Sequence, residues 1–320
     1  MNKTKKIWLF TAGALIFLGT VLFIVAMTAN RWDFSNLSTV KYETNTITIT
    51  ENFRNIDIQT DTADIIFVPS DDGICKAVCY EREKNKHSAT VQNETLTIQS
   101  HDDRKWYEHI EISWGTPKIT VYLPETEYAS LFIQESTGDI EIPKDFYFQN
   151  IDISTSTGDI KNYASASEVM KIKTSTGDIH AENIFANIMN FSVSTGDVEI
   201  ISAVCEETLE INGSTGKFKL ADISCKNLIS KGTTGDIALL DLIAAERISI
   251  QRNTGDVKFD SCDANEIFVK TSTGDVSGSF LSEKSFTTDS NTGKITVPKD
   301  TVGGKCEIFS DTGDIKIEIK

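Results

Sequence analysis

The dipeptide Thr-Gly recurs ten times between residues 137 and 313, and successive copies stand 19 or 20 residues apart. A period this regular indicates one structural unit repeated along the chain. Because glycine tolerates backbone conformations that a side chain forbids, each copy is predicted to form a corner. The predicted corners are Gly138, Gly158, Gly177, Gly196, Gly216, Gly235, Gly255, Gly274, Gly293 and Gly313.

Apolar residues occupy fixed positions around every corner. The residue two places after the glycine is apolar in all ten copies, and the residue four places before the threonine is apolar in eight. This alternation is typical of strands that bury one face. A single unit cannot bury that face, whereas units stacked in parallel can. The pattern therefore predicts an all-β fold, a parallel β-helix (solenoid) of about ten coils of 19–20 residues over residues 131–320.

Residues 51–130 are expected to be the degenerate N-terminal part of the same solenoid. Ala63 stands where a corner glycine would be, and 75 residues separate it from Gly138, which is nearly four repeat lengths. Terminal repeats are usually atypical because they cap the stack. At the other end, Lys316 and Lys320 should lie on the last coil and discourage edge-to-edge pairing.

A membrane segment is predicted at residues 7–29, which carry no charge over a length sufficient to cross a bilayer. Lys3, Lys5 and Lys6 lie in the short basic tail of residues 1–6, so this tail should be cytoplasmic and the C-terminal domain extracellular. Residues 30–50 would link the two parts. A cleaved signal peptide is the alternative, and it exports the same domain. The expected location is thus the cell membrane, with a single pass through the lipid bilayer.

Aspartate follows most of the corner glycines, and stacking would place these carboxylates in a column. One interpretation is a cation-binding ladder. The interpretation we favour is that each Asp caps its own turn by accepting backbone N–H bonds, so that no metal is needed. The column consists of Asp139, Asp159, Asp178, Asp197, Asp236, Asp256, Asp275 and Asp314.

Cys205 and Cys225 each lie nine residues after a corner glycine on neighbouring coils. Stacking would bring them within disulfide range, and export would permit a bond. Two small residues in a stacked column are an equal alternative. Cys262 and Cys306 fall at inward positions and are expected to fill the core.

Other side chains with metal-ligand chemistry gather at residues 101–109, in the sequence His-Asp-Asp-Arg-Lys-Trp-Tyr-Glu-His, and polar surface is the simpler interpretation of them. His87 and His180 are isolated in the sequence. No phosphate-binding Gly-rich loop, nucleophile elbow or HExxH motif occurs, which indicates a protein that is not an enzyme and needs no cofactor. A net charge of −16 disfavours nucleic acid as a partner.

The spaced Ser-Thr-Gly-Asp-Ile units behind one N-terminal apolar segment resemble the bacterial "putative adhesin" family, domain of unknown function 4097, over roughly residues 50–320. The resemblance implies a β-helix in the cell envelope and brings no catalytic residues. We therefore expect a non-catalytic, membrane-anchored adhesin or binding scaffold for an unidentified protein or glycan. Alternatives are an accessory or sensor of a cell-envelope stress response and a polysaccharide-acting enzyme. The enzyme would need long groove-forming loops, for which repeats of 19–20 residues leave no room.

Overall fold

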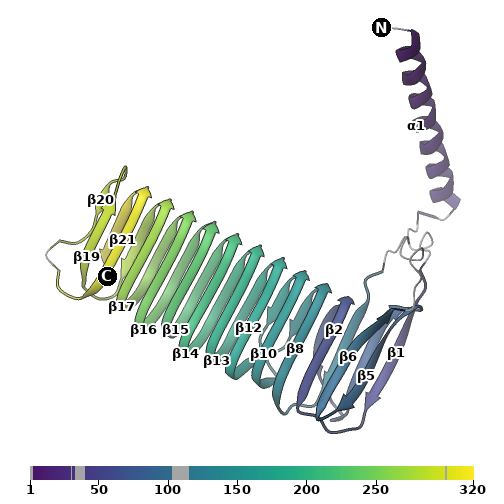
Figure 1. The fold of residues 1–320 in the computed structure, drawn as a ribbon, viewed down its shortest axis with the longest axis horizontal. Helices are drawn as coiled ribbons and strands as arrows, with labels where there is room; N and C mark the ends of the chain where they lie inside the picture. The colour runs from purple at the N-terminus through teal and green to yellow at the C-terminus, as the bar shows by residue number, and fades with distance from the viewer. Residues whose placement is uncertain (1–2, 30, 33–39, 103–114, 300) are drawn as a thin grey trace.

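The computed structural model describes residues 3–29, 31–32, 40–102, 115–299 and 301–320. It begins with one helix, α1 (Lys3–Ala29), and continues entirely in strands (Figure 1). Within Lys5–Ala29 the most apolar stretch of 18 residues has a mean hydropathy of 2.5, and none of that stretch is buried. The helix is therefore long and apolar enough to cross a membrane. It extends into the predicted basic tail, because nothing in that short lysine-rich stretch interrupts a helix.

The strands fall into an N-terminal group, a long regular series and a short C-terminal group. The N-terminal strands are β1 (Tyr42–Ile49), β2 (Asn55–Thr62), β3 (Asp64–Pro69), β4 (Cys75–Arg82), β5 (Asn85–Gln92), β6 (Thr95–Asp102) and β7 (Lys118–Leu123). The regular series is β8 (Glu127–Thr137), β9 (Ile140–Ile142), β10 (Tyr147–Thr157), β11 (Ile160–Asn162), β12 (Ser165–Thr176), β13 (Ile179–Thr195), β14 (Val198–Thr215), β15 (Phe218–Thr234), β16 (Ile237–Thr254) and β17 (Val257–Thr273). The last group is β18 (Val276–Phe280), β19 (Lys284–Ser290), β20 (Ile295–Thr296), β21 (Gly304–Thr312) and β22 (Ile315–Ile319).

The regular series is a parallel β-solenoid, as the repeat predicts. Each strand from β12 to β17 pairs in parallel with the next, and equivalent positions of successive repeats are register partners, such as Thr176 with Thr195. Figure 1 shows these strands side by side in chain order. The aliphatic columns point inward and form one continuous core, in which Ile153, Ile172 and Ile211 are fully buried. The stacking of the repeats thus seals their isoleucines in a shared interior.

The corners stack so closely that a side chain does not fit. The N–H of Gly177 donates to the carbonyl oxygen of Thr195 in the next coil, at 3.0 Å. At Gly196 the backbone has a φ of 142°, and a Cβ atom would lie 2.0 Å from the carbonyl oxygen of Gly177. Both the conformation and the contact exclude larger residues, which explains why glycine recurs at this position.

The N-terminal part contains two irregular coils, in line with the prediction of degenerate repeats. β2 and β3 stack directly on β8 and β9, and β6 and β7 pair in parallel with the other side of β2 and β3. A Cβ at Gly138 would lie 2.1 Å from the carbonyl oxygen of Ala63, so these two corners are immediate neighbours despite the 75 residues between them. The remaining N-terminal strands add antiparallel pairs that cap this end, since β4 lies between β1 and β7, and β5 lies beside β6. The linker predicted over residues 30–50 also contains β1, which begins at Tyr42.

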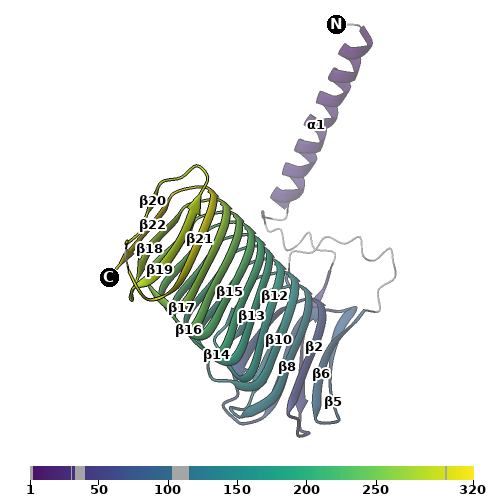
Figure 2. The ribbon, with the colours of Figure 1, turned by 60° about the vertical axis from the view of Figure 1, so that its left-hand side comes forward.

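The C-terminal end also departs from chain order. β21 pairs with β17 on one side and β19 on the other, and β22 lies between β18 and β20. Figures 1 and 2 show this end of the solenoid from two directions, with β21 next to β19 in both. The coil of residues 284–296 is therefore the outermost one. It covers β21 and the start of β22, so Lys316 does not lie at the outer edge as expected, whereas no strand among the described residues pairs with residues 317–319 on the side away from β18. Ile295, whose counterparts are buried, is 39% exposed because no coil covers it.

Candidate functional site

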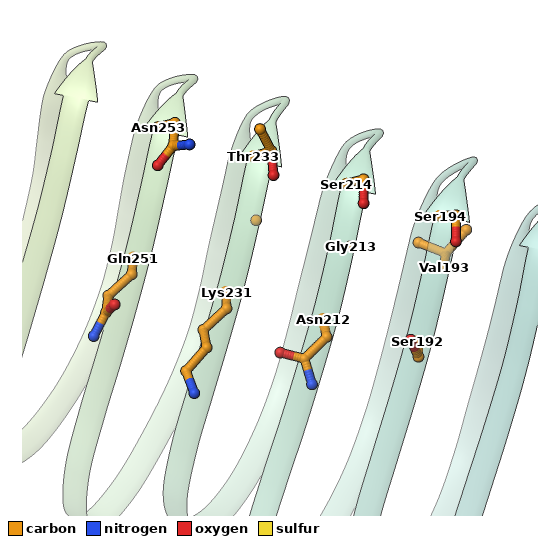
Figure 3. A pocket seen from close by; sticks show the side chains of 11 residues that line it. Ser192, Val193, Ser194, Asn212, Gly213, Ser214, Lys231, Thr233, Gln251 and Asn253 are labelled. Atoms are coloured by element: carbon orange, nitrogen blue, oxygen red, sulfur yellow. The ribbon is translucent and has the colours of Figure 1, made fainter.

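A shallow depression of about 380 Å³ lies on the outer surface of β13 to β16, on the strand segments that lead into the corners. Small hydroxyl and amide side chains line it in two rows, which we call the polar shelf (Figure 3). The first row is Ser192, Asn212, Lys231 and Gln251, which are register partners in successive coils, and the second is Ser194, Ser214, Thr233 and Asn253.

The shelf lies over an unusual part of the core. Arg252 occupies an inward position, is 3% exposed, and places its guanidinium carbon 4.1 Å from the centroid of the Phe218 ring. Its Nη2 donates to the hydroxyl oxygen of Ser230 at 3.2 Å. Room for this side chain exists because Gly232 has no Cβ, which would lie 1.6 Å from Nη1 of Arg252.

Burial lowers the pKa of Arg252 to about 10, so the guanidinium is still protonated at neutral pH. A buried positive charge therefore lies beneath the shelf, and Lys231 adds a second one on its surface. In a chain with a net charge of −16, this part of the surface is locally suited to polar or anionic groups. The shelf was not predicted, because single polar residues at outward strand positions do not differ in sequence from ordinary solvated surface.

The predicted acidic column exists as a stacked ladder of hydrogen bonds. The Oδ1 atom of Asp139 accepts the backbone N–H of Asp159 at 2.9 Å, and Asp159 accepts that of Asp178 at 2.8 Å. The ladder starts at Asp64 and follows the spatial order of the coils, since Asp275 accepts the N–H of Asp314 at 2.7 Å. Each aspartate thus caps the equivalent residue of the next coil and not its own turn, which corrects that detail of the interpretation we favoured.

A second depression, of about 470 Å³, borders the acidic column on β11, β13, β14 and β15. Three of its titratable groups pair with one another: Glu199 accepts from Lys219 at 2.8 Å and lies 3.0 Å from Nδ1 of His180. The hydrogen bond from Lys219 is the main cause of a lowered pKa for Glu199. Since these charges neutralise one another, the second depression offers less to a ligand than the polar shelf.

Cys205 and Cys225 are register partners in β14 and β15, and both are buried as free thiols. Burial raises the pKa of Cys225 to about 12 and that of Cys205 to about 11, which makes both unreactive as thiolates. A disulfide between them stays a prediction. Cys262 and Cys306 are fully buried in the core.

The metal-ligand cluster suggested for residues 101–109 lies mostly outside the described residues. His87, which looked isolated in the sequence, instead lies within reach of Cys79 and Glu81. The signal for this group was present in the sequence as two residues on one face of a strand followed by a hairpin. The sequence does not predict this group, because no repeat or turn motif marks the hairpin that brings His87 back to β4.

The sequence matches the model of a known protein family over most of its length. The family model described as Toastrack DUF4097 matches residues 53–208 and again residues 201–320. No curated protein matches the chain.

Among solved structures, the chain is similar to a "putative lipid binding protein" from Parabacteroides distasonis, with 16% identity, a TM-score of 0.49 and coverage of 88% of this chain and 98% of that one. It is also similar to a "putative adhesin" from Bacteroides fragilis, with 14% identity, a TM-score of 0.43 and coverage of 87% and 97%. A "putative cell adhesion protein" from Clostridium sporogenes matches at 10% identity and a TM-score of 0.25, over 88% and 100% of the two chains.

Proposed function

Because the chain belongs to the Toastrack DUF4097 family, we propose that it is a non-catalytic cell-envelope protein that displays its solenoid as a binding scaffold. The apolar helix α1 would anchor it in the membrane, and the solenoid would bind a polar glycan along the polar shelf. The observation that carries this proposal is the shelf itself, two stacked rows of hydroxyl and amide groups with Lys231 among them. Such groups both donate and accept hydrogen bonds, as the hydroxyls of a sugar do.

The shelf is better suited to binding than to chemistry. Its described lining residues include no histidine, cysteine or carboxylate that could transfer a proton or attack a substrate. The lining also lacks an aromatic ring, so a single sugar should bind weakly and affinity should come from several contacts along the rod.

The membrane topology follows from charge. Lys3, Lys5 and Lys6 precede the most apolar part of α1, which favours a cytoplasmic N-terminus and an extracellular solenoid. A C-terminal epitope tag tests this: antibody should label it on intact cells, and the mature protein should keep α1 by mass spectrometry. Labelling only after permeabilisation would contradict the orientation, and a chain beginning after residue 29 would identify a cleaved signal.

Binding can be tested with the full chain in lipid nanodiscs on an array of bacterial and host glycans. Lys231→Glu and Gln251→Ala should each reduce the signal, because each removes a hydrogen-bond donor and Lys231→Glu also reverses a charge on the shelf. Lys258→Glu, an exposed lysine that does not line the shelf, is the matched control and should bind like the wild type. Binding that is unaffected by both shelf variants would contradict the proposed site.

A further inference from the structure

Three different metal-ligating side chains converge in the N-terminal cap. One ligand atom each from Cys79, Glu81 and His87 lies within 4.8 Å of the other two. Cys79 and Glu81 are two residues apart on β4 and therefore share one face of the strand. The chain then reverses into β5, which pairs with β6 and meets β4 only at Arg82 and Asn85, and His87 on β5 brings its ring to Cys79 and Glu81.

The cluster is buried and held by specific hydrogen bonds. Cys79 and Glu81 are at most 1% exposed and His87 is 8% exposed. One Glu81 oxygen lies 2.8 Å from Nδ1 of His87 and accepts the backbone N–H of the same residue at 2.6 Å. The other accepts from the side-chain amide of Asn45 at 2.6 Å, which ties the cluster to β1.

A carboxylate and an imidazole alone could form a buried structural pair, but this does not account for the thiol that points at them. Thiolate, imidazole and carboxylate together are the ligand types that zinc binds in proteins. Their charges also match, since one thiolate and one carboxylate neutralise a divalent cation in a buried site.

Burial raises the pKa of the Cys79 thiol to about 12, and the neighbouring Glu81 carboxylate adds to this effect. A bound divalent cation reverses such an effect by stabilising the thiolate. The side-chain oxygen of Asn85 lies on the face of β5 that carries His87, and it is buried with no hydrogen-bond partner among the described residues. A zinc ion held by Cys79, Glu81 and His87 would take a water molecule as its fourth ligand.

We propose that Cys79, Glu81 and His87 bind one Zn²⁺ ion, with Asn45 orienting the carboxylate from outside the ligand shell. The ion would join the β4–β5 hairpin at the point where β1 pairs with β4. It would therefore fasten the cap, which closes the end of the solenoid nearer in sequence to α1.

The test uses the full chain purified in detergent, stripped with EDTA and titrated with Zn²⁺ or Co²⁺. One equivalent should bind, the thermal midpoint should rise with Zn²⁺, and Co²⁺ should produce a thiolate-to-metal charge-transfer band. Because loss of an outer partner of a metal ligand already lowers affinity about 10–100-fold, Cys79→Ser should weaken binding at least about 100-fold and abolish the band.

Cys75→Ser is the matched control, since Cys75 is equally buried on the same face of β4 but outside the cluster. It should keep both the affinity and the band. His87→Gln should weaken binding while keeping a thiol, which provides a second variant if Cys79→Ser does not fold. A wild-type chain without the charge-transfer band, or a band that survives Cys79→Ser, would overturn the proposal.

Discussion

Two separate constraints require glycine at a corner of this solenoid: the backbone conformation and the close approach of the next coil. Gly196 has both, whereas Gly73 has a φ of 69° and no neighbouring atom within 4 Å of the place that a Cβ atom would take. Gly196→Ala should therefore lower the free energy of unfolding by more than the about 1–3 kcal/mol of conformational strain alone, because the coils must also separate.

Gly73→Ala is the control for conformation without contact and should show only the strain. Denaturant midpoints followed by circular dichroism compare the two. Equal losses for both variants would mean that inter-coil contact is not what selects glycine at the corners.

Glu135 is a buried carboxylic acid in the first regular coil, at an inward position that carries Thr in several later repeats. It accepts from the Thr60 hydroxyl and, at 3.1 Å, from the backbone N–H of Ala63. Burial raises its pKa from 4.5 to about 8, so the folded state holds a proton that the unfolded state loses above pH 4.5.

The stability contribution of this proton is fully present below pH 4.5 and is lost progressively up to about pH 8. The free energy of unfolding should therefore fall over this range in the wild type, and it should fall less in Glu135→Gln, which stays neutral. The measurement is the difference in the free energy of unfolding between the wild type and Glu135→Gln, taken from denaturation curves at several pH values. A constant difference across the range would contradict a raised pKa.

At the scale of the strand, the core under the polar shelf depends on a missing side chain in one strand and a large side chain in the next. Gly232 on β15 provides the volume that Arg252 on β16 occupies. Gly232→Ala should destabilise the protein by about 1–3 kcal/mol, since overfilling a packed core forces side chains and backbone to shift.

Arg252→Thr, which places the residue found at Thr271 in the equivalent position, should largely remove that penalty in the double variant. A double-mutant cycle measures the coupling, expected at about 0.5–3 kcal/mol. Additive effects would show that the two positions do not share the same space.

The terminal coils provide a second test at the level of elements. Among the described residues, β21 pairs with a strand on each side, whereas β19 pairs only with β21. Amide hydrogens of β21 should therefore exchange more slowly than those of β19, although β21 lies closer to the C-terminus. Hydrogen exchange followed by mass spectrometry separates the two segments, and faster exchange in β21 would contradict the inserted order.

For the molecule as a whole, repetition determined what the sequence could predict. The corners, the inward columns and the solenoid followed from the period, because each position is repeated in every coil. The two ends did not follow, since pairing of Ala63 with Gly138 and insertion of β21 between β17 and β19 depend on contacts between distant segments. The cluster at Cys79 and His87 lies in one of these ends, where no repeat indicates which residues meet.

The acidic column is the feature in which local bonding and overall charge oppose each other. Each aspartate forms a useful hydrogen bond across coils, yet the column adds negative charge along a chain whose net charge is −16. Asp178→Ala should lower the free energy of unfolding by about 1 kcal/mol, because the N–H of Asp197 loses its acceptor.

Asp178→Asn keeps an acceptor oxygen and removes one charge, so at low salt it should be at least as stable as the wild type. The advantage should shrink as salt rises toward about 0.15 M, where charges are screened beyond about 8 Å. Thermal midpoints of the three proteins in a salt series, with CaCl₂ compared at equal ionic strength, make the measurement. If calcium stabilised the wild type beyond the effect of ionic strength and this gain vanished in Asp178→Asn, the column would be a cation site and not only a ladder of hydrogen bonds.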